Sequence, residues 1–184
     1  AWVVEKDDKN IVHLINFSVA LIRNNLINDA KSILEYVLEL DPKNYDAHIN
    51  LCNVYQSMGK SEESLKLSIR AVEIRPNSVV AFNNMGTAFG DLEMIEEAKN
   101  SFAIARDLDP TYLVSSINLG QIEIKTGNYE SAIHIFEDLL AQNKKLSNQE
   151  AELIKYYLSY CYLYKGNLAK GWEFYEFGNN PLLP

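Results

Sequence analysis

Apolar residues recur at helical spacing along the whole chain, most clearly between residues 79 and 110. Each half of this stretch places large apolar side chains on one face of a helix, and a short turn separates the halves. These side chains are Phe82, Met85 and Phe89 in the first half and Ile95, Ala98, Phe102, Ala105 and Leu108 in the second. Pro110 then stops the second helix, because proline lacks an N–H and disfavours helical geometry in the preceding residue. The pattern predicts a pair of short antiparallel amphipathic helices.

This helical pair recurs with a fixed period. Pro42, Pro76 and Pro110 are spaced by 34 residues, and small residues keep the same spacing at two further places. One place holds Ser18, Cys52, Gly86 and Gly120, and the other holds Ala30, Ser64, Ala98 and Ala132. A fixed period of this length is the sequence signature of stacked structural units. The predicted units are residues 11–44, 45–78, 79–112, 113–146 and, five residues late relative to the period, 152–178.

The later units depart from the pattern. In the fourth unit Glu123 stands where earlier units have a large apolar residue, and Lys144 replaces the proline. We therefore expect the end of the second helix of this unit to be less sharply defined than in the earlier units. A longer loop or a longer helix should absorb the extra residues before the fifth unit. Ser147, followed three residues later by Glu150, predicts a capping box that starts the fifth pair.

The order of a large residue, a small residue, an aromatic, an alanine, an aromatic and a closing proline resembles the tetratricopeptide repeat over nearly the entire chain. The resemblance implies an all-α fold, a right-handed α-α superhelix of about five helix-turn-helix repeats. Residues 1–10 are predicted to be the end of a truncated upstream repeat, because VVEKDDKN at 3–10 matches VLELDPKN at 37–44. Residues 11–178 would form the repeat domain, and 179–184 would be a linker.

Composition narrows the class of partner. The formal net charge of -8 argues against nucleic acid or an anionic membrane surface, since phosphate binding needs clustered Lys and Arg. No apolar run is long enough to span a bilayer, so no membrane insertion is expected. The predicted partner is a protein or an extended peptide, and the cytoplasm is the default location.

Candidate catalytic chemistry is sparse. His13, His48 and His134 lie singly in different repeats, and common catalytic and phosphate-binding motifs are absent. Cys52 and Cys161 lack the spacing of a disulfide framework or a zinc site. We expect this chain to be no enzyme in its own right and to have no catalytic residues, cofactor or metal.

The candidate binding residues follow from the family resemblance, which implies that the first helix of each pair lines a concave groove. At the sixth place of each repeat stand Asn16, Asn50, Asn84 and Asn118, here called the asparagine ladder. An asparagine amide both donates and accepts, so it can pair with a peptide backbone. The alternative, that these asparagines are structural contacts between repeats, stays open. The full predicted site is Asn16, Asn50, Asn53, Asn84, Thr87, Asn118, Gln121, Tyr157, Tyr160 and Tyr164.

The tyrosines belong to the fifth unit, where Tyr157 takes the place of the ladder asparagine. Either a partner docks there or a downstream domain covers these rings. The predicted function is a non-catalytic module for protein–protein or protein–peptide interaction through the groove. Two alternatives remain. The ladder is similar to that of O-linked N-acetylglucosamine transferase arrays, and residues 169–178 resemble a segment preceding glycosyltransferase-like domains, which implies a substrate-recognition arm. The other alternative is a scaffold that self-associates end to end through its repeat edges.

Overall fold

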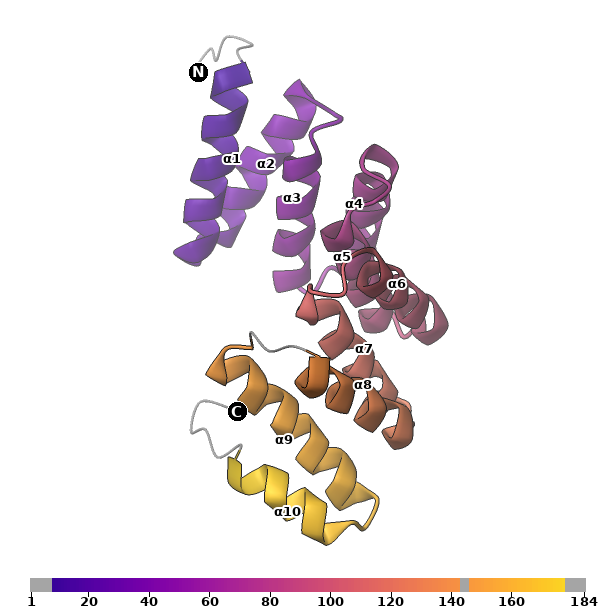
Figure 1. The fold of residues 1–184 in the computed structure, drawn as a ribbon. Helices are drawn as coiled ribbons and strands as arrows, with labels where there is room; N and C mark the ends of the chain where they lie inside the picture. The colour runs from indigo at the N-terminus through magenta and orange to yellow at the C-terminus, as the bar shows by residue number, and fades with distance from the viewer. Residues whose placement is uncertain (1–7, 143–145, 178–184) are drawn as a thin grey trace. The chain divides into compact units, whose positions relative to one another are not determined.

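The computed structural model describes residues 8–142 and 146–177, and within these ranges the chain forms ten α-helices and no strand (Figure 1). The predicted all-α class is confirmed. The helices are α1 (Asp8–Arg23), α2 (Ile27–Leu40), α3 (Tyr45–Ser57), α4 (Ser61–Ile74), α5 (Val79–Asp91), α6 (Ile95–Leu108), α7 (Leu113–Lys125), α8 (Tyr129–Gln142), α9 (Asn148–Tyr164) and α10 (Leu168–Phe177). Direct contacts join α1 with α2, α3 with α4, α7 with α8 and α9 with α10.

The helix ends follow the prolines and the predicted cap. Leu40, Ile74 and Leu108 end α2, α4 and α6, each two residues before a proline. At the start of α9, the Ser147 side chain accepts a hydrogen bond from the Glu150 backbone N–H, and the Glu150 carboxylate accepts one from the Ser147 backbone N–H. The predicted capping box is confirmed.

The turn inside each pair contains one residue in the left-handed region. These residues are Asn25, Gly59, Glu93, Gly127 and Gly166, with φ of 59°, 68°, 59°, 78° and 79°. The following residue donates its N–H back to the preceding helix, as in the bond from Asn128 to the Glu123 carbonyl at 2.8 Å. This bond satisfies a carbonyl at the helix end. Glycine adopts such a conformation freely, whereas Glu93 carries a Cβ there at a cost.

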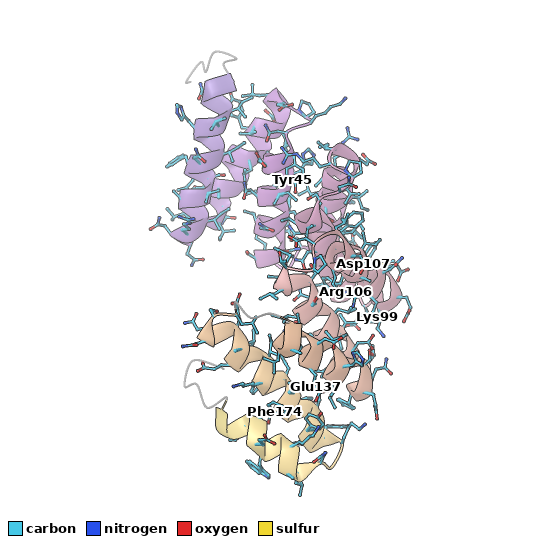
Figure 2. The ribbon with its side chains drawn as sticks, in the orientation of Figure 1. Tyr45, Lys99, Arg106, Asp107, Glu137 and Phe174 are labelled. Carbon is cyan, nitrogen blue, oxygen red and sulfur yellow. The ribbon has the colours of Figure 1, made fainter. Side chains whose placement is uncertain are left out.

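The chain divides into two compact units, residues 1–97 and 98–184. In the first unit, α3 contacts α2, α4 and α5. Its core gathers Ala30, Leu34, Val37, Ala47, Leu51 and Val54. A polar contact accompanies this packing, since the Tyr45 hydroxyl shares a hydrogen bond with the Ser78 hydroxyl (Figure 2). The Arg75 guanidinium lies 3.9 Å from the centre of the Tyr45 ring.

The second unit has its own core around the fully buried ring of Phe136. A Cβ placed on Gly120 would overlap this ring, which is why this small place cannot be enlarged. Tyr162 joins α9 to its neighbours, because its hydroxyl donates to the Glu137 carboxylate at 2.5 Å and its ring stacks on Phe174 at 5.9 Å (Figure 2).

Part of the predicted domain division lies outside the described residues. This holds for residues 1–7 of the predicted upstream repeat and for the predicted linker, 179–184. The last three residues of the predicted upstream segment, 8–10, are the first turn of α1. Residues 143–145, in the predicted longer connection, also lie outside the described ranges. The division into repeats therefore remains a prediction.

Candidate interaction surfaces

In the first unit the asparagine ladder grows more buried from helix to helix. Asn16 on α1 is exposed, Asn50 on α3 is half-buried, and Asn84 on α5 is 6% exposed. These asparagines occupy the same position in successive repeats, but their side chains are not equally exposed to a ligand. Asn16 is the most accessible of the three asparagines in the first unit, and Asn84 is the least accessible.

The amide of Asn84 contacts other residues of the same unit. Its Nδ2 donates to Oδ1 of Asn53 at 2.7 Å, which links α5 to α3. Gln56 adds a second link by donating its Nε2 to the Asn84 backbone carbonyl at 3.2 Å. Burial raises the pKa of the Cys52 thiol, and a hydrogen bond with the Asn84 side chain opposes that rise. At this rung the amide therefore connects neighbouring repeats, as the structural alternative supposes.

Two other predicted groove residues have different surroundings. Thr87 is half-buried and donates its hydroxyl to the Asn83 carbonyl of its own helix at 3.1 Å. Asn118, on α7 of the second unit, is half-buried. Peptide binding by the ladder stays a prediction.

The second unit contains a hollow of about 380 Å³ near the end of α6 and a more apolar one of about 320 Å³ between α7 and α9. The latter, here called the tyrosine hollow, is lined by Gln121, Ile124, Lys125, Tyr156, Tyr157 and Tyr160. Three of the predicted site residues, Gln121, Tyr157 and Tyr160, are thus brought together. The spacing of the lining residues explains the arrangement, because positions three and four apart share a helix face.

The inner wall of the tyrosine hollow is held from two sides. The Gln121 amide donates a hydrogen bond to the Tyr157 hydroxyl. Behind it, the Tyr157 ring stacks on Phe136 with centroids 5.2 Å apart and planes 12° apart. Phe136 is completely buried, so the Tyr157 ring packs against the core of the unit. The wall is therefore preorganised before any ligand arrives.

The outer wall is more open. Tyr156 meets Tyr157 edge to face at 5.6 Å, a favourable geometry for two aromatic rings. Tyr156 is 36% exposed and Tyr160 is 44% exposed. These two rings offer a large, stiff contact area at a small entropic cost, as tyrosines at binding surfaces do.

Tyr164, also predicted as a site residue, is outside the lining of the hollow. Its ring stacks on Tyr129 at 4.3 Å, and Tyr160 lies 6.2 Å from Tyr164 and 6.5 Å from Tyr129. Desolvation of Tyr129, with the hydrogen bond to Tyr164, raises the pKa of the Tyr129 phenol to about 12. The rings of Tyr129, Tyr160 and Tyr164 form an aromatic cluster beside the hollow.

The predicted set omitted three residues that line the hollow, namely Ile124, Lys125 and Tyr156. The sequence contains a signal for each of them. Ile124 and Lys125 follow Gln121 by three and four positions on one helix, and Tyr156 precedes Tyr160 by four positions on another. That these two helix faces meet depends on packing between helices, which sequence spacing alone does not reveal.

Other chemistry in the described residues is limited. Polar side chains that line the 380 Å³ hollow contact one another, as His134 Nδ1 and Asp138 Oδ2 do at 3.1 Å. Both cysteines are buried and free, and burial raises the pKa of Cys161 to about 11. No group of three or more His, Cys, Asp or Glu in the described ranges is arranged to hold a metal ion. None of the helices in these ranges has the length and apolar composition of a membrane span.

Two family models match the chain, and both are described as tetratricopeptide repeat. One matches residues 21–82 and the other residues 115–146. A curated relative, outer dynein arm-docking complex subunit 4 of Xenopus laevis, is 28% identical over 113 residues. That match covers 56% of this chain and 21% of the relative, so the chain spans about a fifth of that protein's length.

Solved structures share the fold at low sequence identity. The pilF protein of Pseudomonas aeruginosa aligns with a TM-score of 0.80 and 20% identity, covering 93% of this chain and 76% of its own. YrrB, described as a TPR protein with an unusual peptide-binding site, gives a TM-score of 0.68, 21% identity and coverage of 95% and 86%. A thermophilic TPR protein of Thermus thermophilus, TTC0263, gives a TM-score of 0.74, 17% identity and coverage of 91% and 89%.

The family matches agree with the observed architecture of helix pairs. Each pair has a left-handed residue in its turn, and helices end before Pro42, Pro76 and Pro110. The structural neighbours have the same fold over nearly the whole length of this chain. The chain belongs to the tetratricopeptide-repeat family.

Proposed function

We propose that this chain is a non-catalytic interaction module that binds protein or peptide segments on the faces of its odd-numbered helices. The observation that carries this proposal is the tyrosine hollow, in which α7 and α9 present fixed aromatic and polar groups to solvent. Aromatic residues are enriched at the centres of protein interfaces, where they combine a large apolar surface with a hydrogen-bonding group.

The fold supports the same proposal in a general way. Tetratricopeptide arrays stack their helix pairs into extended surfaces that other proteins can occupy. YrrB, which shares the fold, is described as having a peptide-binding site. The negative net charge of this chain makes a polyanion an unfavourable partner.

In this proposal the asparagine ladder adds affinity at its accessible rungs. Asn16 is exposed, and Asn50 and Asn118 are half-buried. Each hydrogen bond exchanged for water contributes about 1 kcal/mol net, and ordering the peptide offsets part of that gain. The ladder alone therefore supports only weak binding, and the aromatic surface of the second unit supplies most of the affinity.

The alternative that this chain is the substrate-recognition arm of a glycosyltransferase has less support than a general interaction module. The relatives described above carry no glycosyltransferase name. Asn84 also uses its amide within the protein, so this rung is less suited to hold a substrate backbone.

A capture experiment with matched variants tests the proposal. The wild-type chain, Asn50→Ala/Asn118→Ala and Tyr156→Ala/Tyr160→Ala would each be immobilised and exposed to lysate from the source cells. Tyr175→Ala is the control, because Tyr175 is also an exposed tyrosine of the second unit but belongs to α10. We expect a set of proteins to be captured by wild type and the control and lost from at least one of the two double variants. Identical captured sets for all four chains would contradict the proposed surfaces.

A further inference from the structure

We infer that copies of this chain associate head to tail, with α1 of one copy packed against α9 and α10 of another. The inference goes beyond the proposed function and does not rest on it. Three observations carry it: an open face on α1, an open apolar face on α10, and a pair of polar residues at matching places on α1 and α9.

One face of α1 is open, although the same face is buried in the other odd-numbered helices. It consists of His13, Phe17 and Ala20, at positions i, i+4 and i+7. All three are exposed, and Phe17 is 55% exposed. The equivalent residues, counted by the 34-residue period with the five-residue delay before the fifth unit, are Ala47, Leu51, Val54, Ala81, Met85, Ala88, Ser115, Leu119, Ile122, Ile154, Leu158 and Cys161. Met85 is half-buried and the others are buried.

The last described helix, α10, has a matching open face. Leu168, Trp172 and Tyr175 lie at positions i, i+4 and i+7 and are 59%, 54% and 42% exposed. The rings of Trp172 and Tyr175 meet edge to face at 5.4 Å. The equivalent places on α8 are held by Tyr129, Ile133 and Phe136. None of these three is exposed, so the same face is covered on α8.

The contact between α8 and α9 shows which kind of element covers such a face. Tyr129, Ile133 and Phe136 of α8 share one hydrophobic core with residues of α9, namely Ile154, Leu158 and Cys161. Those α9 residues hold the places that His13, Phe17 and Ala20 hold on α1. The face of α10 is therefore shaped for the first helix of a repeat. Among the described first helices, α1 is the one in which all three places are exposed.

A polar pair favours a second copy over an unrelated helix. Two contacts within the chain place a side-chain hydrogen bond at the same pair of repeat positions, Asn53 with Asn84 and Gln121 with Tyr157. By the same count, stacking one copy on another brings Tyr160 of α9 to Asn16 of α1. Tyr160 is 44% exposed and Asn16 is exposed. A phenol and an amide can each donate and accept, so this pair is complementary.

Apolar burial drives the contact. Covering Phe17, Trp172 and Tyr175 removes large aromatic surfaces from water. The net charge of -8 makes the copies repel one another, so added salt should strengthen the association. The contact joins two different surfaces, so each copy can bind one neighbour at each face.

The first test is sedimentation equilibrium of the chain over about 1–100 μM, a range suited to micromolar affinity. We expect the average mass of wild type to rise above the monomer as concentration rises. Phe17→Glu and Trp172→Glu each place a charge in one face and should weaken association at least about tenfold. Ile69→Glu is the matched control, because Ile69 is an exposed apolar residue of α4 outside both faces, and it should associate like wild type. Circular dichroism checks that each variant is folded.

Mixing the two variants tests the head-to-tail geometry. Phe17→Glu keeps the α10 face intact, and Trp172→Glu keeps the α1 face intact. An equimolar mixture should therefore form a one-to-one dimer that grows no further, while each variant alone stays monomeric. Association of Phe17→Glu alone would indicate a symmetric contact between α10 faces and would overturn the inference. A mixture without the dimer would also overturn it.

A double-mutant cycle tests the register. Asn16→Ala and Tyr160→Phe should each weaken association about fivefold, the equivalent of one hydrogen bond. The double variant should lose little more than either single variant, because both changes remove the same contact. Additive losses would show that these residues do not meet and would overturn the proposed stacking.

The remaining outcomes separate this inference from the proposed function. A wild-type chain that stays monomeric throughout the concentration range would overturn the inference, whatever the capture experiment shows. The measurement is repeated on the protein as the source cells make it. A monomer there would assign both faces to other parts of its own chain and would equally overturn the inference. Association that follows every prediction, with identical captured sets in the capture experiment, would leave self-association standing and contradict the proposed partner surfaces.

Discussion

The ammonium group of Lys99 lies 2.9 Å from the carboxylate of Glu123. Both side chains are largely buried in the second unit, where Lys99 is labelled in Figure 2. Asn128 also donates to this carboxylate, at 3.0 Å. Glu123 occupies the place of Leu21, Tyr55 and Phe89 in the earlier repeats. The fourth repeat therefore has a paired charged residue at a position where the earlier repeats have a leucine or an aromatic residue.

Lys99→Met should destabilise the protein strongly, because it leaves the Glu123 carboxylate 12% exposed and without its cation. We expect the free energy of unfolding to fall by about 3 kcal/mol. Lys99→Met with Glu123→Leu should recover most of this loss, since an apolar pair replaces an ion pair of similar volume. Urea denaturation of the two single variants and the double variant measures the coupling. Simple additivity of the single effects would contradict the pairing.

Glu93→Gly should stabilise the protein. Glu93 has a φ of 59°, where a side chain costs about 1 kcal/mol relative to glycine. The converse change, Gly127→Ala, should destabilise by a similar amount, because Gly127 has a φ of 78°. Thermal melts of both variants give the sign. A lower melting temperature for Glu93→Gly would mean that contacts of the Glu93 side chain outweigh the backbone strain.

The ladder asparagines should differ in their effect on stability. Asn84→Ala removes the donor to Asn53 from a buried position and should cost about 1–2 kcal/mol of unfolding free energy. Asn16→Ala changes an exposed side chain and should stay within about 0.5 kcal/mol of wild type. Denaturant titrations compare the two. Equal effects would mean that the hydrogen bond between Asn84 and Asn53 contributes nothing measurable.

The capping box of α9 should make stability depend on acid pH. The hydrogen bonds that Ser147 gives to Glu150 lower the pKa of this carboxyl below its ordinary 4.5. A carboxyl with a lowered pKa in the folded state stabilises the fold above its unfolded pKa, and the contribution disappears as pH falls through the folded value. Glu150→Gln should therefore melt below wild type at neutral pH and approach it as the pH falls through the folded-state pKa of Glu150. A constant gap at all pH values would contradict this origin.

The sequence predicted the backbone better than the side-chain contacts. Proline spacing and apolar periodicity predicted helix pairs, and Ser147 with Glu150 predicted a cap, because these signals act over a few neighbouring residues. Contacts between repeats act over longer separations. Asn84 meets Asn53 across 31 positions, and Gln121 meets Tyr157 across 36. Such pairs depend on how helices pack, so the period could place these residues at one register but could not reveal their partners.

The left-handed turn residues show a further limit. Gly59, Gly127 and Gly166 fit their conformation, and asparagine tolerates it at position 25. Glu93 gives no sequence signal for a positive φ, and only its equivalence to the glycines of other repeats would have indicated one. The repeat geometry here prevails over the local preference of a single residue.

The double role of Tyr157 has a consequence for how specificity can change. Its ring stacks on Phe136 in the core and its hydroxyl accepts a hydrogen bond from Gln121 at the surface, so substitutions there would alter stability and recognition together. Tyr156 and Tyr160 are exposed and can vary more freely. A combinatorial library restricted to those two positions would retarget the surface while the underlying architecture stays intact.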